Sequence, residues 1–310
     1  MREIAVFGGI SHPALTAEIC AHLDVPQRPV LLKRFANDCL EVQLQSNCRE
    51  RDVFIIQSLV RPVQEHLIEL LLMADAARGA SAARVTAVIP HYAYARSDKK
   101  DAPRISIGGR LIADLLVTAG VNRVLTLNLH SPQVHGFFSV PVDHLHALRE
   151  LASHFRQRDL SHAVVVSPDL GYAKSAAAFA RRLGLPVAAG AKERISDAEV
   201  HITAIIGDVA GRDVIVLDDE ISRGTTVFEL LDRLRDEGAR SVAVACTHGL
   251  FADNALDKLA GTADVTEIVC TNSAPIHAEH PKLTVLSVGP ALAEAISRIH
   301  NGESVSALFD

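Results

Sequence analysis

The most informative part of the chain is the stretch Val216-Leu217-Asp218-Asp219-Glu220-Ile221-Ser222-Arg223-Gly224-Thr225-Thr226. An apolar strand predicted over 213–217 runs into two acids, and a short turn of Ser, Gly and Thr leads into an amphipathic helix predicted over 224–237. Such a turn leaves backbone N–H groups and hydroxyls at a helix N-terminus, where the helix dipole also favours a phosphate. The carboxylates of Asp218 and Asp219 suit sugar hydroxyls or a phosphate-bound Mg²⁺. The stretch therefore predicts a sugar-phosphate site, and an ordinary acidic βα turn is the weaker alternative.

Short apolar runs alternate with helical patterns on both sides of this stretch. We predict strands over 4–7, 52–57, 84–90, 123–128, 163–167, 186–189, 213–217, 241–246, 265–270 and 283–288. We predict helices over 62–77, 107–119, 171–183, 224–237 and 290–300. Apolar strands separated by helices are typical of parallel sheets that are covered on both faces, so the predicted fold class is α/β. Each half follows the same plan, and a domain boundary is expected near 141–150.

The composition narrows the class of protein. The 310 residues are 48% hydrophobic, contain no Trp and carry a formal net charge of −6, which argues against general nucleic-acid binding. The five cysteines show no CxxC spacing and fit reduced thiols. The N-terminus reads as a strand rather than a signal peptide, and no apolar run approaches the roughly 20 residues that span a bilayer. We therefore expect a soluble cytoplasmic protein without a membrane or nucleic-acid partner.

Basic residues follow the strand predicted over 84–90, in the segment His91-Tyr92-Ala93-Tyr94-Ala95-Arg96-Ser97-Asp98-Lys99-Lys100. Loops at the carboxyl ends of strands are where open α/β sheets bind ligands, and three cations there suit a polyphosphate. Taken alone, a solvated basic loop is the more common explanation.

Two further strands end in residues that could bind a metal. His130 follows the strand predicted over 123–128, and Asp169 follows the strand predicted over 163–167. His130 could bind a metal or a phosphate, but a hydrogen-bonded structural histidine is the better interpretation of the residue alone. Asp169 could equally ligate a metal or cap the helix that follows.

A second pair of cations, Lys192 and Arg194, lies in a polar stretch that reaches about residue 200. Cations two positions apart project to the same side of an extended chain. A mobile segment of this kind could close over a reacting phosphoryl group and stabilise its charge. An exposed loop is the simpler alternative.

Taken together, these stretches closely resemble the ribose-phosphate pyrophosphokinase family, also called phosphoribosyl pyrophosphate (PRPP) synthetases. The resemblance covers nearly the whole chain and includes Ile55-Ile56-Gln57-Ser58, Val88-Ile89-Pro90-His91-Tyr92, Leu129-His130-Ser131-Pro132, Pro141-Val142-Asp143-His144-Leu145, Val166-Ser167-Pro168-Asp169, Cys246-Thr247-His248, Thr271-Asn272-Ser273 and Ser287-Val288-Gly289-Pro290.

The resemblance implies an α/β fold of two type I phosphoribosyltransferase-like domains, each a mainly parallel sheet flanked by helices. The expected N-terminal domain, on the ATP side, is 1–145 plus 289–310, and the expected C-terminal domain, on the ribose 5-phosphate side, is 146–288. The implied reaction transfers the pyrophosphoryl group of ATP to the anomeric hydroxyl of ribose 5-phosphate, giving PRPP and AMP. The resemblance also implies Mg²⁺ as cofactor and a homo-oligomer of dimers that assemble into larger rings, such as a hexamer.

The resemblance assigns roles to the candidate residues. It implies Lys192 and Arg194 as catalytic residues, and His130 and Asp169 as metal ligands. The implied ATP-binding residues are Phe35, Asn37, Glu41, Arg96, Ser97, Asp98 and Lys99. The implied ribose 5-phosphate-binding residues are Asp218, Asp219, Ser222, Arg223, Gly224, Thr225 and Thr226.

Several positions depart from the pattern of the family. The segment 34–41 is two residues longer, Leu170 and Tyr172 replace a His and a Gly, and Ser222-Arg223 stands where many members have Asp-Thr. Two alternatives therefore remain beside the active synthetase, namely a non-catalytic regulatory subunit and a diphosphokinase with a shifted sugar or nucleotide preference. A phosphoribosyltransferase that consumes PRPP would share the sugar-phosphate turn, but the segment 91–100 fits it poorly.

Overall fold

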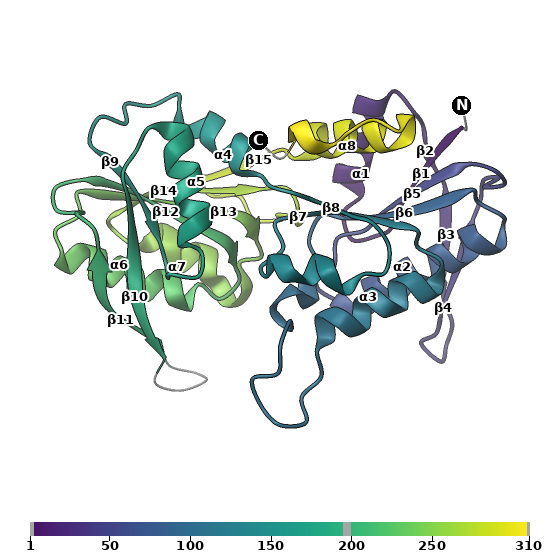
Figure 1. Ribbon diagram of the computed structural model, residues 1–310, viewed down its shortest axis with the longest axis horizontal. Coiled ribbons are helices and arrows are strands. Elements are labelled where there is room, and N and C mark those ends of the chain that lie inside the picture. Colours follow the sequence, from purple (N-terminus) through teal and green to yellow (C-terminus); the bar gives the residue numbers. More distant parts are fainter. Residues whose placement is uncertain (1–2, 195–199, 309–310) are drawn as a thin grey trace. The chain divides into compact units, whose positions relative to one another are not determined.

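The chain forms two units, each built around its own sheet (Figure 1). The computed structural model describes residues 3–194 and 200–308. Unit 1 comprises the chain up to His146, the short segment Ser273–Pro275 and the chain from Val288 onward; unit 2 comprises Ala147–Asn272 and Ile276–Ser287.

Unit 1 contains a six-stranded parallel sheet in the order β2-β1-β5-β6-β7-β8. Its strands are β1 (Ile4–Gly8), β2 (Gln27–Arg28), β5 (Asp52–Ile56), β6 (Arg84–Ile89), β7 (Arg123–Leu127) and β8 (Val142–Leu145). Its helices are α1 (Pro13–Leu23), α2 (Val63–Gly79), α3 (Gly108–Ala119) and α8 (Gly289–Asn301). In Figure 1, α1 and α8 lie on one side of the sheet, and α2 and α3 lie on the other. An antiparallel hairpin, β3 (Val30–Arg34) and β4 (Leu40–Leu44), stands apart from this sheet.

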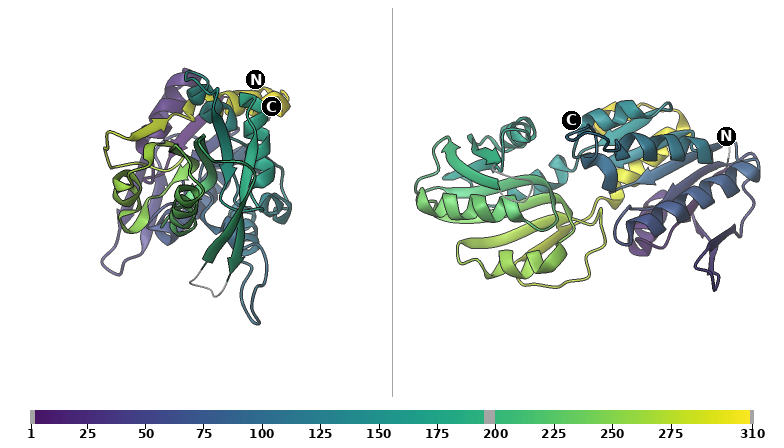
Figure 2. Two further views of the ribbon diagram at one scale, coloured as in Figure 1. Left: turned by 90° about the vertical axis from the view of Figure 1, so that its left-hand side faces the viewer. Right: turned by 90° about the horizontal axis from the view of Figure 1, so that it is seen from below.

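Unit 2 contains a seven-stranded sheet in the order β11-β10-β9-β12-β13-β14-β15, in which only the β10–β11 pair is antiparallel. Its strands are β9 (Ala163–Ser167), β10 (Val187–Arg194), β11 (Val200–Ile206), β12 (Asp213–Ile221), β13 (Ser241–Gly249), β14 (Val265–Thr271) and β15 (Leu283–Leu286). Its helices are α4 (Leu148–Phe155), α5 (Ala173–Leu183), α6 (Thr225–Asp236) and α7 (Ala255–Gly261). The green helix α6 and the yellow-green helix α7 run along one face of the sheet in the right-hand view of Figure 2.

The central strands of unit 2 are apolar on both faces, and helices cover each face. Val214 and Val216 pack with Leu230 of α6, whereas Ile215 and Leu217 pack with Phe179 of α5. Successive strand residues point to opposite faces, so a continuous apolar run supplies two cores at once. This arrangement confirms the predicted α/β class.

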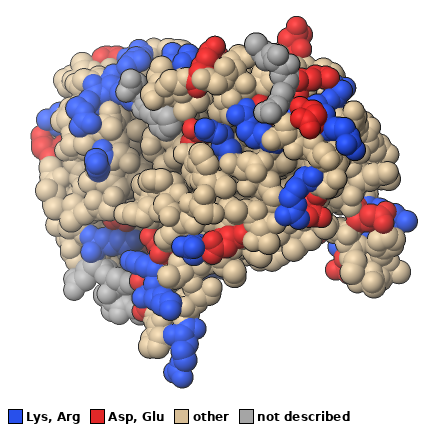
Figure 3. Space-filling view, turned by 45° about the vertical axis from the view of Figure 1, so that its right-hand side comes forward, with Lys and Arg blue, Asp and Glu red and all other residues tan. Residues whose placement is uncertain are grey.

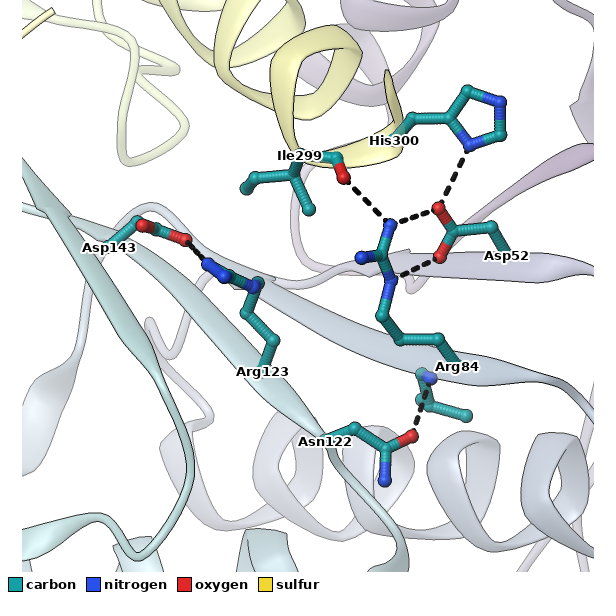
Figure 4. Close-up of polar contacts among 8 residues, drawn as sticks. Asp52, Arg84, Asn122, Arg123, Asp143, Ile299 and His300 are labelled. Atoms are coloured by element: carbon teal, nitrogen blue, oxygen red, sulfur yellow. Dashed lines mark hydrogen bonds and ion pairs between the residues drawn. The ribbon is translucent and has the colours of Figure 1, made fainter. Parts of the chain in front are cut away.

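A network of ion pairs attaches the C-terminal helix α8 to the sheet of unit 1 (Figure 4). Asp52, which is 3% exposed, accepts hydrogen bonds from both Arg84 Nε, at 2.8 Å, and Arg84 Nη2. His300 Nδ1 lies 2.9 Å from Asp52 Oδ2, and Arg84 Nη2 also donates to the carbonyl of Ile299 at 2.9 Å. Asp52 and Arg84 begin β5 and β6, so the network lies at the amino ends of the parallel strands. Ligands of open α/β sheets bind at the carboxyl ends, which gives this network a structural role.

Candidate functional site

The strand that leads into the sugar-phosphate turn is longer than predicted. We expected it to end at 217, but β12 continues to Ile221 because β13 beside it also continues, with Asp218 opposite Cys246 and Glu220 opposite His248. Asp218 and Asp219 are therefore strand residues and not part of the turn. The turn itself is reduced to residues 222–224, between β12 and α6.

Three carboxylates come together in unit 2. Asp219 is 3% exposed, and its backbone N–H donates to Asp218 Oδ1 at 2.8 Å. Burial raises the pKa of the Asp218 carboxyl well above its ordinary value, and the nearby charges of Asp219 and Asp169 raise that pKa further. Because negative charge is crowded here, a cation would be stabilised at this position.

The two carboxylate oxygens of Asp169 have different partners. Its Oδ1 accepts a hydrogen bond from the backbone N–H of Tyr172 at 3.1 Å, which shapes the turn before α5. Its Oδ2 lies 3.6 Å from Lys192 Nζ, and the two side chains are 34% and 24% exposed. One oxygen thus holds the turn, while the other forms an ion pair within reach of solvent and of a ligand.

We expected the basic pair to lie in a loop, but it lies on a strand. Lys192 and Arg194 belong to β10, which pairs with β11 through an irregularity between Ala191 and Lys192. Antiparallel pairing satisfies the backbone of a polar segment and so allows it to be extended. The segment 195–199, which completes the polar stretch that we expected to be mobile, lies outside the described residues.

The sugar-phosphate turn enters α6 through Gly224, whose φ of +76° favours glycine. A Cβ at this position would also lie 3.1 Å from the ring of Phe228. No side chain in the described part of the chain caps α6, so the backbone N–H groups of its first turn, which contains Thr225 and Thr226, are left without a side-chain partner beside Ser222. The arrangement provides the donors that the sequence predicted for a phosphate.

In unit 1, the loops after β6 and β7 are joined at their polar residues. Asp98 Oδ2 lies 2.5 Å from the hydroxyl of Ser131, which directly follows His130. The backbone N–H of Leu129 donates to His144 Nε2 at 2.8 Å. His144 lies on β8, so a side chain of that strand supports the same turn. The structure therefore places the predicted nucleotide loop beside the turn of His130.

Ser97 shapes this nucleotide loop. The exposed residues Arg96 and Lys99 flank it, Arg96 ending the short 3₁₀ helix η1 (Ala93–Arg96). The hydroxyl of Ser97 accepts from the backbone N–H of Gly108 at 2.8 Å, which closes the loop onto the start of α3. Lys99 Nζ lies 3.5 Å from Asp101, and both side chains are more than 60% exposed, so this ion pair is weak and can exchange for another anion.

Phe35 and Asn37 lie in the turn of the β3–β4 hairpin, and Glu41 lies on β4. The ring of Phe35 is 40% exposed and has Lys33 Nζ 4.7 Å from its centroid. Asn37 Oδ1 accepts from the backbone N–H of Cys39 at 3.2 Å, so this amide shapes the longer turn. An exposed aromatic ring beside a cation can stack on a base.

Three residues near these sites were not singled out as site residues by the sequence. Ser131 and His144 occur in stretches that carry the resemblance, which was the available signal, whereas nothing in the sequence pointed to Asp253. Asp253 Oδ2 accepts from Arg223 Nε at 2.7 Å, 30 residues away in the chain.

The residues present fit Mg²⁺. In the part of the chain that the structure describes, no three His, Cys, Asp or Glu side chains form a metal-binding group by themselves. Mg²⁺ keeps several waters and is commonly held by one or two carboxylates and substrate phosphates. The carboxylate of Asp169, one of the two predicted ligands, is of that type, and its repulsion with the neighbouring Asp218 would be relieved by a cation.

Comparison with known proteins matches two family models along the chain. Residues 4–120 match the N-terminal domain of ribose phosphate pyrophosphokinase, and residues 196–310 match the phosphoribosyl synthetase-associated domain. None of the described helices combines the length and the apolar character that crossing a membrane requires.

Similar proteins span the full length of the chain. A putative ribose-phosphate pyrophosphokinase of Streptomyces coelicolor is 71% identical over 100% of this chain and 98% of its own length. A ribose-phosphate pyrophosphokinase of Deinococcus radiodurans is 49% identical over 99% of this chain and 98% of its own length. The crystal structure of phosphoribosylpyrophosphate synthetase from Mycobacterium smegmatis is 37% identical, with a TM-score of 0.91 over 97% of this chain and 100% of that chain. These matches confirm the expected fold of two phosphoribosyltransferase-like units.

Proposed function

The chain belongs to the ribose-phosphate pyrophosphokinase family, and we propose that it transfers the β,γ-pyrophosphoryl group of ATP to the anomeric hydroxyl of ribose 5-phosphate. In this reaction the anomeric hydroxyl loses its proton, which is released to solvent, and its oxygen forms a bond to the β-phosphorus. The bond from that phosphorus to the α,β-bridging oxygen breaks, and AMP leaves with that oxygen. The observation that supports the proposal most is the gathering of Lys192, Asp169 and Asp218 around the strand ends next to an uncapped helix start. Charged groups of these kinds are required to bind a phosphorylated sugar and to stabilise a transferring phosphoryl group.

Lys192 has the central catalytic role in this proposal. In the described structure its ammonium lies 3.6 Å from Asp169 Oδ2. When ATP and sugar are bound, Lys192 and Arg194 offset the charge on the pyrophosphoryl group as it moves. Holding both reactants in line supplies much of the acceleration, and no covalent enzyme intermediate is involved.

On the sugar side, Asp218 and Asp219 orient the ribose. The 5-phosphate is held by the turn into α6, that is, by Ser222, Arg223, Gly224, Thr225 and Thr226. The backbone N–H groups at the start of this helix are the principal donors.

On the nucleotide side, Phe35 stacks on the adenine. The other predicted ATP-binding residues bind the ribose and the phosphates, namely Asn37, Glu41, Arg96, Ser97, Asp98 and Lys99. The bond between Asp98 and Ser131 supports the proposal, because it fixes the nucleotide loop beside His130. Unit 1 is accordingly the ATP side, and unit 2 is the ribose 5-phosphate side.

Mg²⁺ is the proposed cofactor, with His130 and Asp169 as its protein ligands. When bound, it neutralises phosphate charge and organises the triphosphate. Asp169 is suited to this task because one of its oxygens is already fixed by the Tyr172 N–H and the other is open to exchange its lysine for a cation.

We also propose a cytoplasmic homo-oligomer, built from dimers and reaching a hexamer. Large apolar side chains are exposed on unit 1, among them Leu31 (44%) on β3, Ile68 (47%) on α2 and Leu111 (52%) on α3. Exposed apolar surface of this kind supports association. Light scattering after gel filtration measures the assembly state.

Figure 3 shows basic and acidic side chains interspersed on one face, a mixed charge that does not suggest a nucleic-acid surface.

The decisive test is release of AMP by the purified protein. We expect AMP and PRPP to form in equal amounts only when ATP, Mg²⁺ and ribose 5-phosphate are all present, and chelation of Mg²⁺ to stop the reaction. No AMP at high enzyme concentration would favour the regulatory subunit. Faster turnover with another sugar phosphate or nucleotide would favour a shifted preference.

Substitution of Asp218 by Asn tests the sugar side and has two expected results. We expect KM for ribose 5-phosphate to rise by about tenfold or more, because one charged partner of the sugar is lost. Because the pKa of Asp218 is raised in the folded protein, this group destabilises the fold at neutral pH, and the cost falls away only as the pH is lowered to the ordinary pKa of 3.8. The variant should therefore unfold at a higher temperature than the wild type at pH 7 in the absence of ligands. Unchanged sugar kinetics would remove Asp218 from the site.

A further inference from the structure

An ion pair joins the sugar-phosphate turn to a second loop of unit 2. Arg223 Nε donates to Asp253 Oδ2 at 2.7 Å, and the two side chains are 72% and 53% exposed. Asp253 lies in the loop that follows β13, within the short 3₁₀ helix η3 (Ala252–Asn254). It is the nearest acid that the structure assigns to this arginine.

The second loop is held against the turn by its backbone. The N–H groups of Leu250 and Phe251 donate to the carbonyl of Ile221 at 2.9 and 3.1 Å, and the N–H of Ala252 donates to the carbonyl of Ser222 at 3.0 Å. These bonds fix the Asp253 backbone next to residues 221–223, whatever its side chain does. The carboxylate consequently remains close to the turn even when its ion pair is broken.

An exposed ion pair of this kind is weak and exchangeable. Such pairs contribute little because water screens the charges and both side chains lose freedom when they associate. A sugar 5-phosphate carries up to two negative charges and would sit at the start of α6, where the backbone donors and the dipole hold it. Arg223, in the same turn, can exchange a singly charged partner for a doubly charged one.

We propose that Asp253 competes with the 5-phosphate of the sugar substrate for Arg223 and thereby sets the affinity of the enzyme for that substrate. The inference rests on the proposed function, because it concerns the same sugar-phosphate site. Asp253 weakens substrate binding in two ways: it occupies the guanidinium, and its own negative charge faces the incoming phosphate. Arg223 and Asp253 thus act as a pair that keeps the affinity below what the turn and its arginine alone would give.

The proposal predicts an improvement in binding when an acid is removed. At low ionic strength, Asp253→Asn is expected to lower KM for ribose 5-phosphate about threefold and to leave kcat unchanged. Arg223→Gln is expected to raise this KM several-fold, and in that background Asp253→Asn is expected to have a much smaller effect. The differences are expected to shrink in 0.5 M salt, because exposed charges are screened. Asp208→Asn is the matched control, since Asp208 forms an exposed pair with Arg212 at 2.9 Å elsewhere in the same unit.

Kinetics of AMP release and calorimetric titration with ribose 5-phosphate alone provide the two readouts. An active enzyme in which Asp253→Asn leaves KM unchanged, or raises it, overturns the inference, and a raised KM would make Asp253 a residue that positions Arg223 for phosphate. The same holds if Asp253→Asn improves binding equally with and without Arg223. A wild-type protein that releases no AMP refutes the proposed function instead, and the titration then still measures whether Asp253→Asn tightens binding of the sugar phosphate.

Discussion

Replacing Lys192 with Ala is expected to lower kcat about 100- to 1,000-fold while changing KM for ATP by less than about threefold. The proposed role of this ammonium is to stabilise charge that develops on the transferring group, and a group of this type contributes to the transition state far more than to substrate binding. In the free protein the ammonium is balanced by Asp169 at 3.6 Å, so it is already positioned beside the proposed metal ligand. We expect Arg194→Ala to act in the same direction.

Steady-state kinetics of AMP release, with ATP and ribose 5-phosphate varied in turn, measure this effect. Lys258→Ala is the control, because Lys258 is an exposed lysine of α7 and its removal is expected to leave both constants unchanged. If Lys192→Ala raised KM for ATP and left kcat intact, its role would be ground-state binding.

Substituting Asp52 by Ala is expected to lower the free energy of unfolding by about 3 kcal/mol, the lower end of the usual cost of leaving a buried charge without its partner, because the Arg84 side chain left behind is 31% exposed. The carboxylate is 3% exposed and is bonded by both Arg84 and His300, so its removal leaves two groups without their acid (Figure 4). One of these groups belongs to α8, and loss of the bond loosens the attachment of that helix to the sheet.

Urea unfolding, followed by circular dichroism, gives the shift in midpoint. The exposed pair of Asp75 with Arg78, at 2.5 Å in the same unit, provides the comparison. Asp75→Ala is expected to cost less than about 1 kcal/mol, because exposed pairs contribute little. Equal losses for the two variants would show that burial does not make the Asp52 network important. Asp52→Asn, which keeps the shape of the side chain, is expected to fall between them.

Much of the fold could be predicted from the alternation of apolar strands and helical patterns. The strand predicted over 163–167 and the helix predicted over 171–183 correspond to β9 and α5. Several elements were missed, including α1, α4, α7, β8, β11 and the β3–β4 hairpin. The alternating residues of β3 and β4 are only half-buried, so the hairpin depends on pairing between its strands and on contacts such as Arg34 with Glu65 of α2. Such contacts are made in space and leave no local signal.

The boundary of β12 shows the same limit at the site. A Ser-Gly-Thr turn marked where the helix starts, but the acids before it looked like part of the turn. They are strand residues because β13, more than 20 residues further along the chain, offers partners as far as Gly249. A strand ends where its neighbour stops pairing, and the neighbour is not visible in the local sequence.

The sequence by itself determined the class of fold and the family to which the chain belongs, and it supplied the residues proposed to meet the substrates, because these depend on local patterns and on ordered matches along the chain. Only the tertiary structure decided that Lys192 is paired with Asp169, that burial and two neighbouring acids raise the pKa of Asp218, and that Asp253 lies against Arg223. The physical reason is that charge interactions and desolvation depend on distance in space, and parallel strands bring together residues that the chain separates by a whole strand–helix unit.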